Sequence, residues 1–166
     1  ALEANTTGGS NTAVGGQTMY YNTEGEQNAA LGYFALGSNT TGDYNTAIGA
    51  NALYTNTTAS NNTAVGKSAS ASNTTGANHV AVGALALQSN TTGQENTAVG
   101  QAALNANTTG GTNCAFGKNA LAVNTTASNN SAFGHSALLS NTTGTQNVAV
   151  GANALDANTT SQGITA

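Results

Sequence analysis

Three side chains in this 166-residue sequence are candidates for nucleophilic or general-base chemistry: Cys114, His79 and His135. A cysteine nucleophile needs a histidine within hydrogen-bond reach to take its proton. The sequence repeat described below places these side chains in different columns or in distant repeats, so it predicts no Cys-His pair. We therefore expect no catalytic residue and no enzymatic activity. Cys114 is interpreted as a small buried filler, His79 as a hydrogen-bonding substitute for asparagine, and His135 as a surface residue.

Carboxylates are the only other candidate metal ligands, and the chain has six of them. Calcium-binding β-rolls repeat their aspartates on a glycine-rich period of about nine residues. Here acidic residues share a repeat position only as Glu26 with Asp43 and as Glu3 with Asp156. Glu26 and Asp43 are the one pair that a cation could bridge, but we interpret them as solvated carboxylates that repel each other. We expect no metal and no cofactor.

The elements that carry these residues are blocks of 17 residues, which recur nine times without insertion or deletion. Each block has an anchor, Asn-Thr-Ala-Val-Gly or a near copy. The anchor glycines are Gly15, Gly32, Gly49, Gly66, Gly83, Gly100, Gly117, Gly134 and Gly151. Spacing this constant predicts that every block occupies an equivalent place in a stack of coils.

Each block predicts a short strand in its anchor, with Thr12 and Val14 pointing to one side and Ala13 to the other. The Ala-Leu pair that follows, as in Ala35-Leu36, predicts a second strand. The Asn-Thr-Thr-Gly segment predicts a corner, because glycine tolerates a positive φ and asparagine caps turns. Together these elements predict an all-β fold, a parallel β-solenoid (β-roll) with coils about 4.8 Å apart.

Asparagine fills one position of every block, where it supplies both a donor and an acceptor and could pass amide hydrogen bonds from coil to coil. This predicted structural ladder is Asn5, Asn22, Asn39, Asn56, Asn73, Asn90, Asn107, Asn124, Asn141 and Asn158. Nine of these begin Asn-Thr-Thr triplets that match the N-glycosylation acceptor. We interpret them as structural, because a glycan on a stacked asparagine would break the register.

The predicted strand has no charged residue in any copy, and both of its faces are small or apolar. One face can fill the coil, and we expect the other to meet the same face of another copy of the chain. The sequence thus favours a homo-oligomer, with a trimer as the preferred state. We expect residues 1–166 to be one uncapped repeat array of nine anchors and about ten coils, a segment of a longer fibre.

The anchors Asn-Thr-Ala-Val-Gly, Asn-Thr-Ala-Ile-Gly (45–49) and Asn-Val-Ala-Val-Gly (147–151) resemble the head repeats of YadA-like trimeric autotransporter adhesins. Similar repeats occur in bacterial and phage fibre proteins. The resemblance implies a trimeric, left-handed parallel β-roll that is displayed outside a cell or on a virion and binds a surface or matrix. The head repeats of that family are usually shorter than 17 residues.

Function is predicted from this architecture and from the aromatic residues. All five tyrosines, Tyr20, Tyr21, Tyr33, Tyr44 and Tyr54, fall in the first third of the chain. They are candidates for contact with a cell-surface glycan or a protein receptor, or they cover the boundary with a preceding module. We expect a non-enzymatic structural and adhesive fibre segment that is extracellular, on a cell surface or in a virion fibre. The alternative is an ice-binding solenoid that uses the unbroken ladder Thr6, Thr23, Thr40 and their equivalents.

Composition excludes two other classes of partner. Charged residues make up 5% of the chain and only Lys67 and Lys118 are basic, so we expect no nucleic-acid binding. No run of about 18 apolar residues is present, so we expect no membrane contact within this segment.

Overall fold

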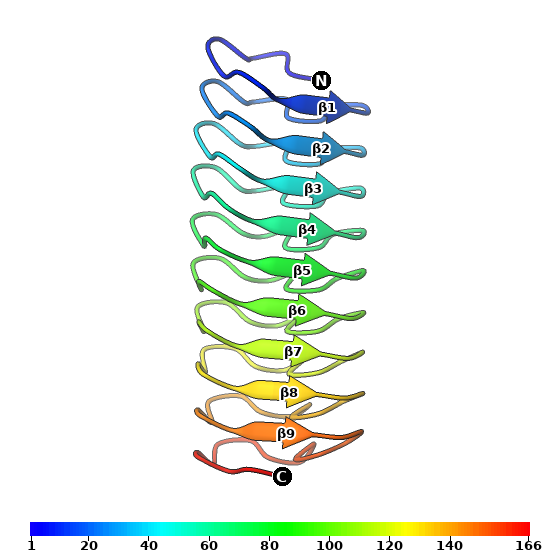
Figure 1. Cartoon of the computed structure of the whole chain (residues 1–166), viewed down its shortest axis with the longest axis vertical. Helices are drawn as coiled ribbons and strands as arrows, with labels where there is room; N and C mark the ends of the chain where they lie inside the picture. Colours follow the sequence, from blue (N-terminus) through cyan, green and yellow to red (C-terminus); the bar gives the residue numbers. More distant parts are fainter.

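The computed structural model describes residues 1–166 and is a single stack of coils with one strand in each coil (Figure 1). The nine strands pair in parallel and in chain order, forming one sheet along the whole rod. Their bounds are β1 Thr12–Val14, β2 Ala29–Leu31, β3 Thr46–Ile48, β4 Thr63–Val65, β5 Val80–Val82, β6 Thr97–Val99, β7 Cys114–Phe116, β8 Ser131–Phe133 and β9 Val148–Val150. The predicted all-β parallel solenoid is confirmed.

Equivalent residues of successive blocks lie directly above one another. Ala13 pairs with Ala30, and Ala30 pairs with Ala47, so the register advances by one full block at each step. A further bridge joins Val148 to Thr165 beyond the last named strand. The constant block length is therefore explained by pairing, because one inserted residue would turn every later side chain of that coil to the opposite face.

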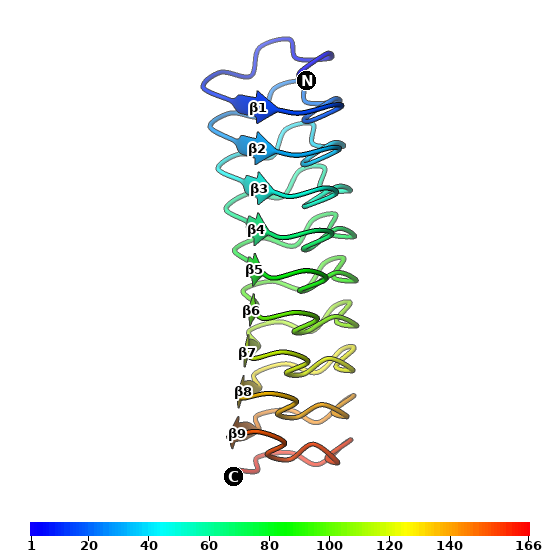
Figure 2. The same ribbon diagram turned by 90° about the vertical axis from the view of Figure 1, so that its right-hand side faces the viewer.

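The coils wind with a left-handed sense. All strand arrows point the same way on one side of the rod, and the chain returns behind them as it descends towards the C-terminus (Figures 1 and 2). This hand is rare for the connection between parallel strands.

The second predicted strand does not exist. The leucine of the Ala-Leu pair has a left-handed backbone, with φ 52° at Leu36 and 50° at Leu104. The segment folds into successive turns instead, in which the amide of Ala35 donates to the oxygen of Gly32 and that of Gly37 to Phe34. Left-handed φ values are uncommon in residues with a side chain. Here the Leu36 amide also donates to the Ala52 oxygen of the next coil at 2.9 Å, and its side chain is fully buried.

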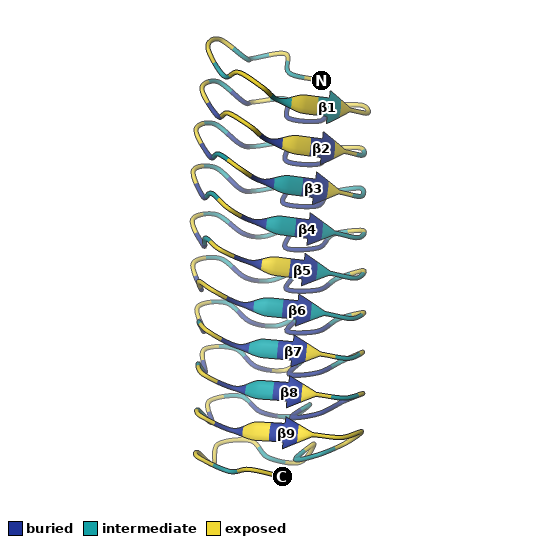
Figure 3. Ribbon diagram, viewed as in Figure 1, coloured by how far each residue is buried: buried dark blue, intermediate teal, exposed yellow.

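The core is a narrow column inside the coils. It consists of the central alanine of each strand, the alanine of the Ala-Leu pair and the leucine beside it, with Met19 and Ser70 at two of the leucine positions. The two outer residues of each strand lie on the side opposite the central alanine, as the sequence predicted; they point away from this core and are exposed or half-buried (Figure 3).

The predicted corner at Asn-Thr-Thr-Gly is present, but the reason given for its glycine is wrong. Gly25 and its equivalents do not have a positive φ; the left-handed residue is the one before each anchor asparagine, for example Tyr44 with φ 57°. Glycine is instead favoured by close stacking, although alanine occupies the equivalent positions 59 and 127. A Cβ atom added to Gly25 would lie 2.6 Å from the oxygen of Gly42 and 2.6 Å from the side-chain oxygen of Asn22.

Helices are absent from this architecture, and accordingly no helix of the length and apolarity needed to cross a membrane is found.

Candidate functional site

The surface of the rod has no pocket, and no group of three or more His, Cys, Asp or Glu side chains lies close enough to hold a metal ion. Candidate sites are therefore surfaces. Four features of the rod are candidates: a column of outward apolar side chains, clustered aromatic rings, the charged residues on either side of the sheet, and the asparagine ladders that fix the positions of the coils.

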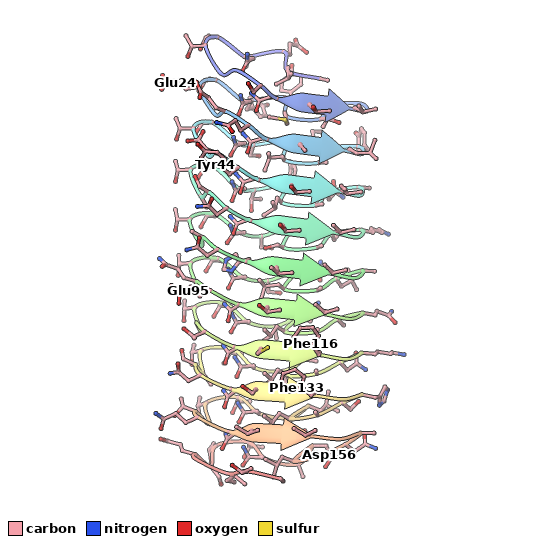
Figure 4. The ribbon with its side chains drawn as sticks, in the orientation of Figure 1. Glu24, Tyr44, Glu95, Phe116, Phe133 and Asp156 are labelled. Carbon is pink, nitrogen blue, oxygen red and sulfur yellow. The ribbon has the colours of Figure 1, made fainter.

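The apolar stripe is the column of residues before the anchor glycines: Val14, Leu31, Ile48, Val65, Val82, Val99, Phe116, Phe133 and Val150. These side chains project outward from the sheet, and six of them are more than one third exposed. The rings of Phe116 and Phe133 stack at 5.3 Å with an interplanar angle of 8° (Figure 4). The stripe has no charge and runs the length of the rod.

A second outward column runs beside the stripe at the first residue of each strand, with Thr in four coils and with Ala, Val, Cys or Ser in the others. Cys114 belongs to this column and is half-buried on the outer face of the sheet. The prediction that it is a buried filler is wrong in its position, although partial burial raises the pKa of its thiol. A raised pKa keeps the thiol protonated and lowers its reactivity.

Four of the five tyrosines lie in two clusters of ring contacts, Tyr20 with Tyr21 and Tyr33 with Phe34 and Tyr54, which we name together the aromatic patch. Its rings meet edge to face, with centroids 4.8 Å apart for Tyr20 and Tyr21, 4.5 Å for Tyr33 and Phe34, and 5.3 Å for Phe34 and Tyr54. Sequence reasoning missed Phe34, which links Tyr33 to Tyr54.

Two glycines make room for the patch. A Cβ atom on Gly16 would touch the ring of Tyr33 at 3.4 Å, and one on Gly37 would touch Tyr54 at 3.3 Å. Tyr44 is separate from the patch: it lies where the chain enters the strands, and it accepts a hydrogen bond from Gln27 (Figure 4). The carboxylate of Glu3 raises the pKa of Tyr20 through its charge and a hydrogen bond.

The ladder of ten asparagines is continuous. Each side-chain amide donates to the Oδ1 atom of the asparagine one coil nearer the N-terminus, in nine links of 2.7–3.0 Å. Its second hydrogen goes to the carbonyl three residues ahead, as from Asn22 to Gly25 at 3.0 Å. Both amide hydrogens are used, so a glycan on a buried member of the ladder would break it.

A second ladder runs through the anchor asparagines. The Oδ1 atom of Asn11 accepts the backbone N–H of Asn28, whose own amide donates to Gly42. His79 takes the place of asparagine in this ladder: its Nδ1 atom accepts the N–H of Asn96, its Nε2 atom lies 3.1 Å from the side-chain nitrogen of Asn90, and the ring forms a hydrogen bond with the backbone of Gly93. Burial lowers the pKa of His79 to about 4, so the ring is neutral at pH 7.

The threonines that directly follow the ladder asparagines use their hydroxyls in hydrogen bonds. Each donates to the carbonyl of its equivalent in the next coil, as Thr23 does to Thr40 at 3.0 Å. The next threonines along the chain are exposed: Thr7, Thr41, Thr58, Thr75, Thr92, Thr109, Thr126, Thr143 and Thr160.

Charged residues divide between the flanks of the sheet. The trailing flank, the residues directly after the anchor glycines, carries Lys67, Lys118 and His135. The leading flank, the four residues before each anchor asparagine, carries Glu24, Glu26, Asp43 and Glu95. An Asp43 oxygen accepts the backbone N–H of Glu26 at 2.7 Å.

Comparison with known protein families, with curated proteins and with solved structures gives no match.

Proposed function

We propose that the chain is a non-enzymatic fibre segment that acts as a rigid spacer and as a surface-binding module outside a cell or on a virion. The observation that carries this proposal is the unbroken stack of coils with an apolar stripe along its length. Every coil pairs with its neighbours through backbone and asparagine hydrogen bonds, which suits a rod that keeps its shape under load.

The same stripe supports assembly from several copies of the chain. Contiguous exposed apolar surface of this extent is typical of an interaction site. A second copy offers a stripe of the same length, coil spacing and chemistry. In a closed cyclic assembly every stripe faces the common axis and none is left open. We propose three copies, the number that the resemblance to trimeric adhesin heads implies.

The aromatic patch is the proposed contact with a receptor. Tyr21 and Tyr33 are each more than half exposed, and their positions are fixed by ring contacts within the patch and by a rigid backbone. Such rings stack on sugar rings or pack against a protein at a small entropic cost. A cell-surface glycan or a protein receptor is the partner that we propose for this patch.

Ice binding is the alternative function. The observation that favours it is the column of exposed threonines on the corner, one in each coil except where Glu24 takes the place of the threonine. The rest of the rod carries very little charge. A thermal-hysteresis assay separates the two proposals: measurable hysteresis would favour ice binding, and a freezing point equal to the melting point would reject it.

Sedimentation equilibrium over a wide concentration range tests the fibre proposal. We expect a particle of three times the 16.1 kDa chain mass. A stable, soluble monomer at all concentrations would contradict it.

A further inference from the structure

Two N-glycosylation acceptor sequences lie outside the asparagine ladder. They begin at Asn61 and Asn129, and each is completed two residues later by a hydroxyl, that of Thr63 and of Ser131 respectively. Both acceptors are the last residue of the leading flank, directly before an anchor asparagine. Neither is a member of the ladder, so a sugar on either one would leave the ladder hydrogen bonds intact.

Both acceptor side chains are open to solvent. The backbone N–H of each donates to a carbonyl of the preceding coil, at 3.0 Å for Asn61 and 3.2 Å for Asn129, and both residues are exposed. Their side-chain amides have no hydrogen-bond partner within the chain, so both amide hydrogens are free. The residues of the same column in the adjoining coils are exposed as well: Tyr44, Asn78, Thr112 and Gln146.

The hydroxyl that completes each acceptor sequence is on the surface too. Thr63 is the first residue of β4 and Ser131 is the first residue of β8, so both belong to the outward column beside the stripe and are half-buried. An enzyme that approaches the leading flank therefore meets the amide and the hydroxyl without opening the coil.

The ladder asparagines are in the opposite situation. Their acceptor sequences have side chains with no exposed surface, and both amide hydrogens are used, as Asn107 uses them on Asn90 and Gly110. Seven acceptor sequences begin at fully buried ladder members: Asn39, Asn56, Asn73, Asn90, Asn107, Asn124 and Asn141.

We infer that the folded chain accepts N-linked sugars at Asn61 and Asn129 and not at the buried ladder asparagines. The donor is a sugar activated as a phosphate ester at its anomeric carbon. A bond forms between that carbon and the Nδ2 atom of the asparagine, and the bond from the carbon to the phosphate oxygen breaks. The phosphate leaves with the electron pair, and the amide gives one proton to a base of the transferase.

Sugars at these two sites would project from one side of the rod. The acceptors lie four coils apart in one column, a separation of about 19 Å. They lie where the chain enters the strands, whereas the apolar stripe lies at the far end of each strand. The modification therefore leaves the stripe free, and it goes beyond the proposed fibre function without depending on how many copies assemble.

Asn78 is a matched control within the chain. It occupies the same column, is exposed and has φ 61°, against 62° at Asn61. Its acceptor sequence is incomplete, because Val80 stands where Thr63 stands two coils of register away in β4. Val80→Thr completes the sequence at Asn78, and Thr63→Val removes it at Asn61. Threonine and valine both occur at this strand position, so we expect both variants to fold, and circular dichroism checks it.

The test uses the folded chain, UDP-glucose and an N-glycosyltransferase that has first been shown to modify the free peptide 58–65. Peptide mapping by mass spectrometry locates the sugar. We expect transfer at Asn61 and Asn129 to exceed that at Asn78 by about tenfold or more. Val80→Thr should raise transfer at Asn78 by about tenfold or more, and Thr63→Val should abolish it at Asn61 without changing it at Asn129.

Absence of transfer to Asn61 and Asn129 in the folded chain would overturn the inference, since the free peptide is modified. Equal transfer to the buried ladder asparagines would also overturn it, because burial would then give no protection. A chain that is modified at both sites but monomeric at all concentrations would reject the proposed assembly and keep this inference, and an unmodified oligomer would do the reverse.

Discussion

The side-chain amide of Asn107 donates to the Oδ1 atom of Asn90, one coil away, over 2.9 Å. The same amide donates to the oxygen of Gly110 at 2.9 Å, and Asn124 donates to Asn107 in turn. All of these asparagines are fully buried. No other side chain supplies two donors and an acceptor in so short a length, which explains why this position is always asparagine.

Replacing Asn107 with alanine should therefore destabilise the rod. It leaves the Oδ1 of Asn90 and one amide hydrogen of Asn124 without partners, while the carbonyl of Gly110 keeps only the amide of Asn96 at 2.8 Å. A buried polar group without a partner costs about 1–3 kcal/mol, so we expect a loss of about 3 kcal/mol or more in the free energy of unfolding. Urea denaturation measures it. Thr109→Ala, two residues away and exposed, is the control, and equal losses for the two variants would contradict the ladder.

His79 should make stability depend on pH. Its pKa is about 4 in the folded chain and near 6.5 when unfolded, so the unfolded chain binds the proton more readily between these values. Stability therefore falls as the pH drops from about 6.5 to about 4, by about 3 kcal/mol in total. Below pH 4 the contribution levels off.

The His79→Asn variant tests this contribution, because asparagine occupies the equivalent position in the other coils. Denaturation curves between pH 7.5 and 4 should show a smaller loss of stability for the variant than for the wild type. If both chains lose stability in parallel, the acid sensitivity does not come from His79.

Two glycines in one coil should respond differently to alanine. Gly100 has φ +133° and lies against the backbone of Gly117, where an added Cβ would be 2.6 Å from the carbonyl carbon. Gly93 also lies close to a carbonyl of the next coil, but its equivalents Ala59 and Ala127 show that the corner accommodates a methyl group. We expect Gly100→Ala to cost about 3 kcal/mol or more and Gly93→Ala less than half as much. Thermal or urea denaturation of the two variants checks the ranking, and a larger effect at Gly93 would refute it.

Ser70 is a polar residue in the core column, and replacing it with leucine should stabilise the fold. It occupies the position that is leucine or methionine in the other coils, and its hydroxyl is buried without a hydrogen-bond partner. Its φ of 49° is close to the 50° of Leu53, so leucine fits the backbone there. Ser70→Leu should raise the free energy of unfolding by about 2 kcal/mol or more, through apolar burial and removal of the orphaned hydroxyl. A lower stability than that of the wild type would show that the coil has no room for the side chain.

Spacing alone was sufficient to predict the stack, the single-residue register and the placement of Thr12 and Val14 on one side of the strand with Ala13 on the other. These follow from the period of a strand and from equal block lengths, both of which can be read from the sequence. The same reasoning failed at Leu36, because an Ala-Leu pair does not reveal a left-handed backbone. That conformation is stabilised by hydrogen bonds to the next coil, which are contacts between distant residues.

The candidate surfaces could be predicted only in part. The five tyrosines could be named from the sequence. The separation of Tyr44 from the aromatic patch could not, because it depends on which side of the coil each tyrosine position faces. Phe34 was missed for the same reason. The charged residues were recognised as solvent-exposed, yet their division between the two flanks of the sheet appeared only when the coil had a defined front and back.

Analytical ultracentrifugation of a stripe variant tests the central claim most directly. Val82→Lys combined with Val99→Lys places two charges on the apolar stripe, while Thr75→Lys with Thr92→Lys places the same charges, at the same spacing, on the exposed corner. We predict a mass of three chains for the wild type and the corner variant, and a folded monomer of 16.1 kDa for the stripe variant. A stripe variant that sediments like the wild type would contradict the account, since it would show that the stripe is not where copies of the chain meet.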